Sequence, residues 1–133
     1  MASAFYPKGK ETALGLLCGN GTKPTGTLKA ALVDTGTYTY SAAHQYYSSV
    51  SGVVGTPVAI GSPTYTNGTL DGGDVTFSAV SGNTAEAIIV YLDTGSAATS
   101  PLVIYIDSAT GLPFTPNGGD ANITWSGSGI GTI

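Results

Sequence analysis

Residues 85–107, with the sequence AEAIIVYLDTGSAATSPLVIYID, decide the fold class of this chain. They contain two dense apolar runs, at 85–92 and 102–107, which are rich in β-branched and aromatic side chains. Short runs of this kind, bounded by turn-forming residues, are typical of strands that are buried on both faces. The Gly, Ser, Thr and Pro residues between the runs suit a longer hairpin loop. We therefore expect the two runs to form an antiparallel hairpin.

Further segments with strand character lie on both sides of this hairpin, and Gly-, Pro- and Asn-rich turns separate them. These segments are 28–34, 37–40, 53–60, 63–70, 74–80 and 122–126. Pro57 confines the segment 53–60 to a sheet edge or a bulge, because proline cannot donate to the ladder. The spacing predicts an all-β protein, an antiparallel β-sandwich or barrel-like domain. The expected core residues are Phe77, Ile88, Val90, Val103 and Ile106.

One short helix is predicted near 41–50, where Ser41 is a suitable N-cap and apolar residues recur at helical spacing. Residues 1–27 are predicted to be an irregular N-terminal arm. Within this arm, residues 10–17 could form about two helical turns, which Gly15 would weaken. The expected organisation is thus an arm at 1–27 followed by a single β domain at 28–133.

The composition argues against catalysis and against bound cofactors. Only 9% of the 133 residues are charged, arginine is absent, and His44 and Cys18 are the single histidine and the single cysteine. A structural zinc site needs four Cys or His ligands, and one cysteine cannot form an intrachain disulfide. No glycine-rich phosphate-binding motif occurs. We therefore expect a non-enzymatic protein without a metal or another cofactor.

Charge is distributed unevenly along the chain. Residues 1–29 hold all four lysines and one acid, Glu11, whereas residues 30–133 hold seven acids and no base. Such asymmetry indicates an arm that docks on an acidic partner, or else a solvated terminus. The candidate partner-contact residues are Phe5, Tyr6, Lys8, Lys10 and Lys23. Nucleic acid is a poor partner for a chain of net charge −4, and no apolar run approaches the ~18 residues of a membrane span.

Two short segments of the sequence are similar to each other. GGDVTF at 72–77 and GGDANI at 118–123 each place a Gly-Gly-Asp turn before a strand. The structural interpretation is that glycine permits the turn and aspartate caps it. The alternative is a calcium site built from Asp71, Asp74 and Asp120, although the spacing matches no EF-hand loop.

Several segments together resemble a family of small virion proteins of tailed bacteriophages. These segments are KAALVDTGTYTYSAAHQYY at 29–47, DVTFSAVSG at 74–82, AEAIIVYLD at 85–93 and SATGLPFTPNGGD at 108–120. Phe5-Tyr6 and Lys8-Gly9-Lys10 also match the start of such proteins. The resemblance covers most of residues 28–125. The chain departs from the family pattern at 15–27, which is rich in Gly and Thr, and at the Gly/Ser tail 126–133.

The resemblance implies a structural role in the virion, made in the bacterial host cytoplasm and located on the capsid surface. Some similar proteins are decoration or cement proteins, which implies binding to the major capsid protein and to further copies of the chain, with a trimer as the first expectation. The alternative is a tail or fibre component that acts as a carbohydrate-binding module. In that case the aromatic residues would stack on sugars instead of packing internally. These residues are Tyr38, Tyr40, Tyr46, Tyr47 and Trp125.

Overall fold

The computed structural model describes residues 3–133 and is mostly β, with 35% of residues in strands and 15% in helices. The strands are β1 (Ala4–Phe5), β2 (Thr27–Val33), β3 (Val53–Ala59), β4 (Thr69–Leu70), β5 (Val75–Phe77), β6 (Ala87–Asp93), β7 (Leu102–Ile106), β8 (Ala121–Ile123) and β9 (Gly131–Thr132). A five-stranded antiparallel sheet has the order β1-β7-β6-β2-β3. Two ribbons, β4–β9 and β5–β8, complete the fold. The all-β, sandwich-like prediction is thus confirmed.

The expected hairpin is the β6–β7 pair at the centre of the sheet. Its register pairs Ile88 with Ile106 and Val90 with Ile104. The connecting loop contains a 3-10 turn, Ala97–Thr99, and the buried Ser100. The Ser100 Oγ accepts a hydrogen bond from the Thr94 amide at 3.0 Å and donates one to the Ser96 carbonyl at 2.7 Å. The buried hydroxyl is therefore fully paired, which removes the cost of desolvating it.

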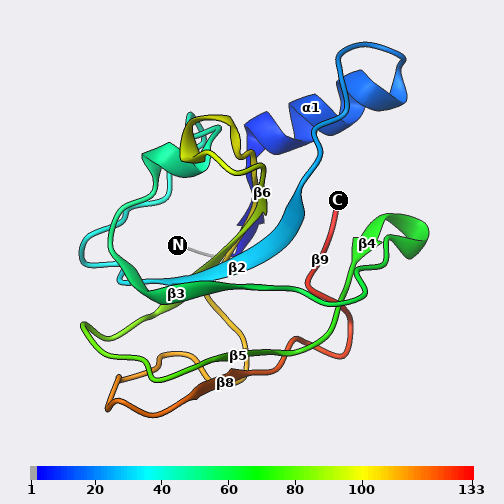
Figure 1. Ribbon diagram of the computed structural model, residues 1–133. Coiled ribbons are helices and arrows are strands. Elements are labelled where there is room, and N and C mark those ends of the chain that lie inside the picture. The colour runs from blue at the N-terminus through cyan, green and yellow to red at the C-terminus, as the bar shows by residue number, and fades with distance from the viewer. Residues whose placement is uncertain (1–2) are drawn as a thin grey trace.

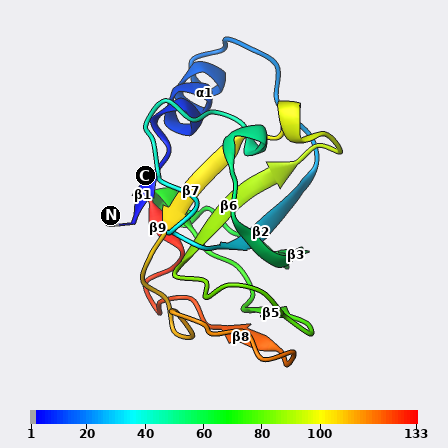
Figure 2. The same cartoon turned by 90° about the vertical axis from the view of Figure 1, so that its left-hand side faces the viewer.

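The central strands are apolar on both sides because each face of the sheet is covered. One face packs against the β5–β8 ribbon, which lies below the sheet in Figure 1, and holds Ile88, Val90 and Ile106 with Phe77 of the ribbon. The other face lies under the connection between β2 and β3 and carries a separate cluster that includes Tyr6, Tyr38 and Tyr105. In Figure 2 the broad sides of β6 and β7 face the viewer, and the β5 and β8 strands lie at the bottom.

Four of the five predicted core residues are fully buried, and the fifth is not. Val103 is only partly buried, because it lies on the face of β7 that borders helix α1 (Pro7–Leu17). The edge position predicted from Pro57 is confirmed, since β3 is the outermost strand on its side of the sheet. Within residues 3–133, no helix has the length and apolar character needed to cross a membrane.

Replacing Ile88 with Ala is expected to lower the free energy of unfolding by about 2–5 kcal/mol, because the side chain is completely buried between strands β2 and β7. Ile88→Val, which removes a single methyl group, should cost about 0.5–1.5 kcal/mol. Urea denaturation of the two variants measures both values. An Ile88→Ala change that costs no more than the Val variant would contradict the packing described here.

The helix predicted at 41–50 is wrong. This segment is irregular and contains one 3-10 turn, Tyr47–Ser49. Backbone hydrogen bonds tie it to the start of β7, with the Leu102 amide donating to the Gln45 carbonyl and the Tyr47 amide to the Ser100 carbonyl. The Tyr47 ring also stacks on Tyr91 at a centroid distance of 4.0 Å. A helix would give up these contacts, so tertiary packing overrides the local helical pattern.

The irregular arm predicted for 1–27 is also wrong in its described part, apart from the helical turns expected at 10–17, and residues 1–2 lie outside the described residues. Ala4 and Phe5 form β1 and extend the sheet beside β7. The helix α1 follows, with Pro7 in its first turn, where a missing amide hydrogen costs nothing. It ends at Leu17, and Gly19 just beyond it adopts φ +84° and donates its amide to the Leu16 carbonyl.

Candidate functional site

The N-terminal helix lies on the edge of the sheet without burying any of its residues. Gly9 makes this approach possible, since a Cβ at this position would come within 2.6 Å of the Leu102 carbonyl oxygen. Leu14 and Leu17 are 61% and 83% exposed, although both are large apolar side chains. Figure 1 shows α1 above the sheet, with the chain looping outward before it enters β2. The helix therefore presents apolar surface to solvent.

An apolar groove runs beside α1 and continues toward the C-terminal strand β9. It consists of two adjoining cavities of about 260 and 240 Å³ that share four lining residues. We define the apolar groove by Phe5, Leu16, Leu28, Val103 and Ile133. Ile133 is 60% exposed and lines both cavities. Sequence reasoning missed this groove, because its members come from five separate segments.

The four lysines differ in what they contact. Lys29 forms an ion pair with Asp93 at 2.7 Å. The hydrogen bond from Lys29, together with one from the Gly95 amide, holds the pKa of Asp93 below its usual value. Lys8 pairs with Glu11 at 3.3 Å on the exposed face of α1. Lys10 and Lys23 are exposed and make no ion pair within residues 3–133.

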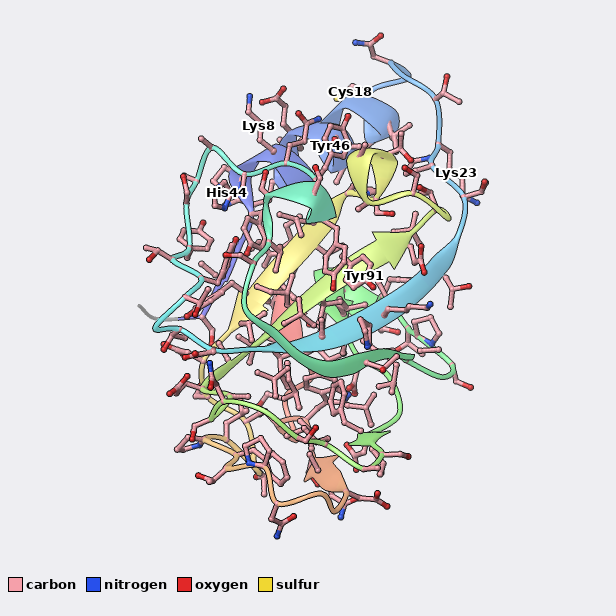
Figure 3. All side chains as sticks on the ribbon, turned by 60° about the vertical axis from the view of Figure 1, so that its left-hand side comes forward. Lys8, Cys18, Lys23, His44, Tyr46 and Tyr91 are labelled. Atoms are coloured by element: carbon pink, nitrogen blue, oxygen red, sulfur yellow. The ribbon has the colours of Figure 1, made fainter. Side chains whose placement is uncertain are left out.

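Four of the five predicted contact residues are accessible at this end of the molecule, and Tyr6 is not. Phe5 lines the groove, and Lys8, Lys10 and Lys23 lie on α1 or the loop that follows it. Figure 3 shows Lys8 and Lys23 well separated along this end. Tyr6 has 0% exposure, and its amide donates to the Val103 carbonyl. The prediction that Tyr6 contacts a partner is therefore wrong, because its ring is part of the core.

A chain of hydrogen bonds leads from Tyr6 to the surface. The Tyr6 and Tyr38 hydroxyls are 2.7 Å apart, and the Tyr38 hydroxyl is 2.9 Å from Nδ1 of His44. His44, the only histidine of the chain, thus serves to satisfy a buried tyrosine hydroxyl. Burial, and then the hydrogen bond to Tyr38, raise the pKa of Tyr6 far above its ordinary value of 10.0.

Stability is expected to fall as the pH rises above about 10, because burial raises the pKa of Tyr6, Tyr38, Tyr47, Tyr91 and Tyr105. Above this pH the tyrosines of the unfolded chain lose protons that those of the folded chain keep. The stability that the buried tyrosines contribute is therefore fully present below the ordinary tyrosine pKa and is lost as the pH rises above it. Denaturation at a series of alkaline pH values measures this loss. If the free energy of unfolding of Tyr6→Phe declines with rising pH as steeply as that of the wild type, Tyr6 does not contribute to the alkaline loss of stability.

The similarity of the two Gly-Gly-Asp segments has a structural explanation. The strands that follow the two motifs, β5 and β8, pair with each other, with Val75 opposite Ile123. Asp74 accepts a hydrogen bond from the Trp125 amide at 3.1 Å, and Asp120 accepts one from the Ala79 amide at 3.0 Å. Each aspartate thus caps the end of the other strand in the same way.

These contacts bear on the calcium alternative. The third candidate, Asp71, accepts a hydrogen bond from the Gly72 amide. Among residues 3–133, no group of three or more His, Cys, Asp or Glu side chains is arranged to hold a metal ion. The aspartates therefore support the turn interpretation.

Most of the aromatic residues considered for sugar stacking pack internally. Trp125 is buried, and its Nε1 donates to the Gly73 carbonyl at 2.9 Å. Tyr38 is buried, and Tyr47 has one face against Tyr91. Among the five, Tyr40 and Tyr47 are half-buried and Tyr46 is exposed.

No protein-family model matches the chain, and the search of curated proteins also finds no match.

Proposed function

We propose that this chain is a structural protein of a tailed-bacteriophage virion, a decoration protein that binds the major capsid protein on the outside of the head. The observation that carries the docking part of this proposal is the apolar groove beside α1. Apolar side chains left exposed along a groove are a common feature of protein-binding sites. The identity of the partner rests on the family resemblance of the sequence.

The composition of the groove suits this role. The half-buried side chains of Phe5, Leu16 and Val103 line it, together with Ile133, which is 60% exposed. Apolar side chains of a partner that fill such a groove would gain free energy in proportion to the area removed from water. The exposed Lys10 beside it would speed encounter with an acidic shell and confer sensitivity to salt.

Decoration stabilises a capsid through linkage. A protein that binds the assembled lattice and not the free subunits lowers the free energy of the assembled state. Many copies, or trimers placed at local three-fold positions, would act together without a strong contact in any single copy. No catalytic constellation is needed, which agrees with a sole histidine that is engaged by Tyr38.

Co-sedimentation with empty heads of the phage that encodes the chain tests this proposal. We expect saturable binding at low salt that weakens as the salt concentration rises. Tails from the same phage serve as the control particle. Binding to tails but not to heads would contradict decoration and favour the tail or fibre alternative, and binding to neither would contradict a surface role in the virion.

A further inference from the structure

The sequence contains three Asn-Gly pairs, at 20–21, 67–68 and 117–118. In such a pair the asparagine side chain and the next backbone nitrogen are close enough to form a five-membered ring, and glycine has no Cβ to hinder the approach. Ring closure requires a glycine amide that loses its proton to solvent and an asparagine side chain that is free to turn toward it. The fold decides which of the three pairs meets both requirements.

The pair Asn67-Gly68 lies in a 3-10 turn that hydrogen bonds hold on both sides. The Gly68 amide donates to the Tyr65 carbonyl at 3.2 Å, and the Gly68 carbonyl accepts a hydrogen bond from the Ile133 amide at 3.0 Å. The nitrogen that would attack Asn67 is therefore engaged, and its residue is anchored to the end of the chain.

The pair Asn117-Gly118 is restrained at both reacting groups. The Gly118 amide donates to the Val80 carbonyl at 2.8 Å. The Asn117 Oδ1 accepts a hydrogen bond from the Gly119 amide at 2.9 Å, which turns the side chain toward Gly119. Both hydrogen bonds would have to break before the ring could close.

The pair Asn20-Gly21 is exposed and lacks these restraints. It lies in the loop that follows α1 and extends outward in Figure 1. The Asn20 amide donates to the Gly15 carbonyl at 2.7 Å, which fixes the start of the loop. Beyond this point, within residues 3–133, the amides of Gly21, Thr22 and Lys23 donate to no protein acceptor, and the Asn20 side chain forms no hydrogen bond.

We infer that Asn20 is a site of spontaneous deamidation, which the fold favours here over the other two Asn-Gly pairs. The Gly21 nitrogen, after losing its proton to hydroxide, attacks Cγ of Asn20. The N–Cγ bond forms, the Cγ–Nδ2 bond breaks, and Nδ2 takes a proton from water and leaves as ammonia. Water then opens the resulting succinimide. Cleavage of the bond between nitrogen and Cγ gives aspartate, and cleavage at the main-chain carbonyl carbon gives isoaspartate.

The modification changes the end of the molecule that holds the apolar groove. It replaces a neutral amide by a carboxylate, so segment 18–26 loses its net positive charge, because Lys23 is its only charged residue. Isoaspartate also routes the backbone through the side chain, which lengthens the loop by a methylene group. Pro24 of the same loop and Leu16 of α1 line the groove, so the altered loop borders it.

Incubation of the folded chain at neutral and at mildly alkaline pH, followed by a short chymotryptic digestion and mass spectrometry, tests this inference. Cleavage after aromatic residues and leucines places the three pairs on separate peptides. We expect Asn20 to deamidate about tenfold or more faster than the other two asparagines, because an amide hydrogen bond must break first at those sites and a tenfold rate ratio corresponds to about 1.4 kcal/mol. The rate should rise with pH, since the attacking nitrogen must lose its proton.

Two controls separate the effect of the fold from the chemistry of the motif. In the chain unfolded by urea, the three pairs should react at similar rates, because the hydrogen bonds that distinguish them are gone. Asn20→Gln should remove the fast step in the folded chain, since glutamine would have to close a six-membered ring, which forms far more slowly.

Equal rates at the three pairs of the folded chain, or a faster reaction at Asn67 or Asn117, would overturn the inference. An Asn20 that stays intact in the folded chain while the unfolded chain reacts would overturn it as well. These measurements contain no phage particles, so their outcome is independent of binding to heads.

Discussion

Tyr6→Ala is expected to lower the free energy of unfolding by about 3–5 kcal/mol, the range for truncating a large aromatic side chain in a core. The ring is completely buried and packs with Tyr40, whose centroid is 5.0 Å away. Its loss would also leave Tyr38 without one of its two hydroxyl partners. Because β1 and α1 flank this residue, their attachment to the sheet should weaken together.

Tyr6→Phe provides the matched control, because it keeps the ring and removes only the hydroxyl. Its expected cost is about 0.5–1.5 kcal/mol, since Tyr38 keeps its hydrogen bond to His44. Urea denaturation followed by the fluorescence of Trp125, the single tryptophan, measures both variants. A Tyr6→Ala cost no larger than that of Tyr6→Phe would mean that the ring is exposed, and it would restore Tyr6 as a candidate contact residue.

Ile133→Asp is expected to weaken binding to phage heads by about 10- to 100-fold. Burying an isoleucine side chain contributes about 1.5–3 kcal/mol, and about 1.4 kcal/mol corresponds to a tenfold change in affinity. Ile133 lines both cavities of the apolar groove and is 60% exposed in the free protein, so an aspartate at this position should not disturb the fold.

Leu17→Asp is the control for this prediction. Leu17 is even more exposed but lines neither cavity of the groove, so the same change of chemistry should leave head binding nearly intact. Binding isotherms of both variants on empty heads give the comparison. Equal losses in the two variants would place the contact on the outer face of α1 rather than in the groove.

The sheet could be predicted from the sequence because the residue patterns that indicate its strands are local. The apolar runs of β6 and β7 are too dense to be exposed, and Pro57 restricts β3 to an edge. The alternation of Val75 and Phe77 identifies the inner face of β5, where both side chains are buried. Each of these features depends on neighbouring residues in the chain, so periodicity alone detects it.

The wrong predictions of a helix at 41–50 and of an irregular arm at 1–27 have a common physical cause. The segment 41–50 has helical periodicity, but its backbone groups bond to residues at the start of β7. The helical turns expected at 10–17 are present, but the helix begins earlier, at Pro7, and Gly9 allows it to approach the Leu102 carbonyl. In both cases contacts distant in sequence determine the local structure, and periodicity contains no information about them.

The candidate site was only partly predictable for the same reason. Segregation of the lysines, which is visible in the sequence, pointed to the end of the molecule where the apolar groove lies. The apolar groove joins residues as distant as Phe5 and Ile133. This arrangement does not follow from spacing, because it depends on the order of strands in the sheet.

Image reconstruction of virions with and without this protein tests directly whether it decorates the head. We expect density for a small β domain on the outer surface of the head, with α1 and the apolar groove against the shell and copies clustered around local three-fold positions. This density should be missing from heads that lack the protein. Heads that are identical in the two reconstructions, or density for this domain on the tail alone, would contradict the account.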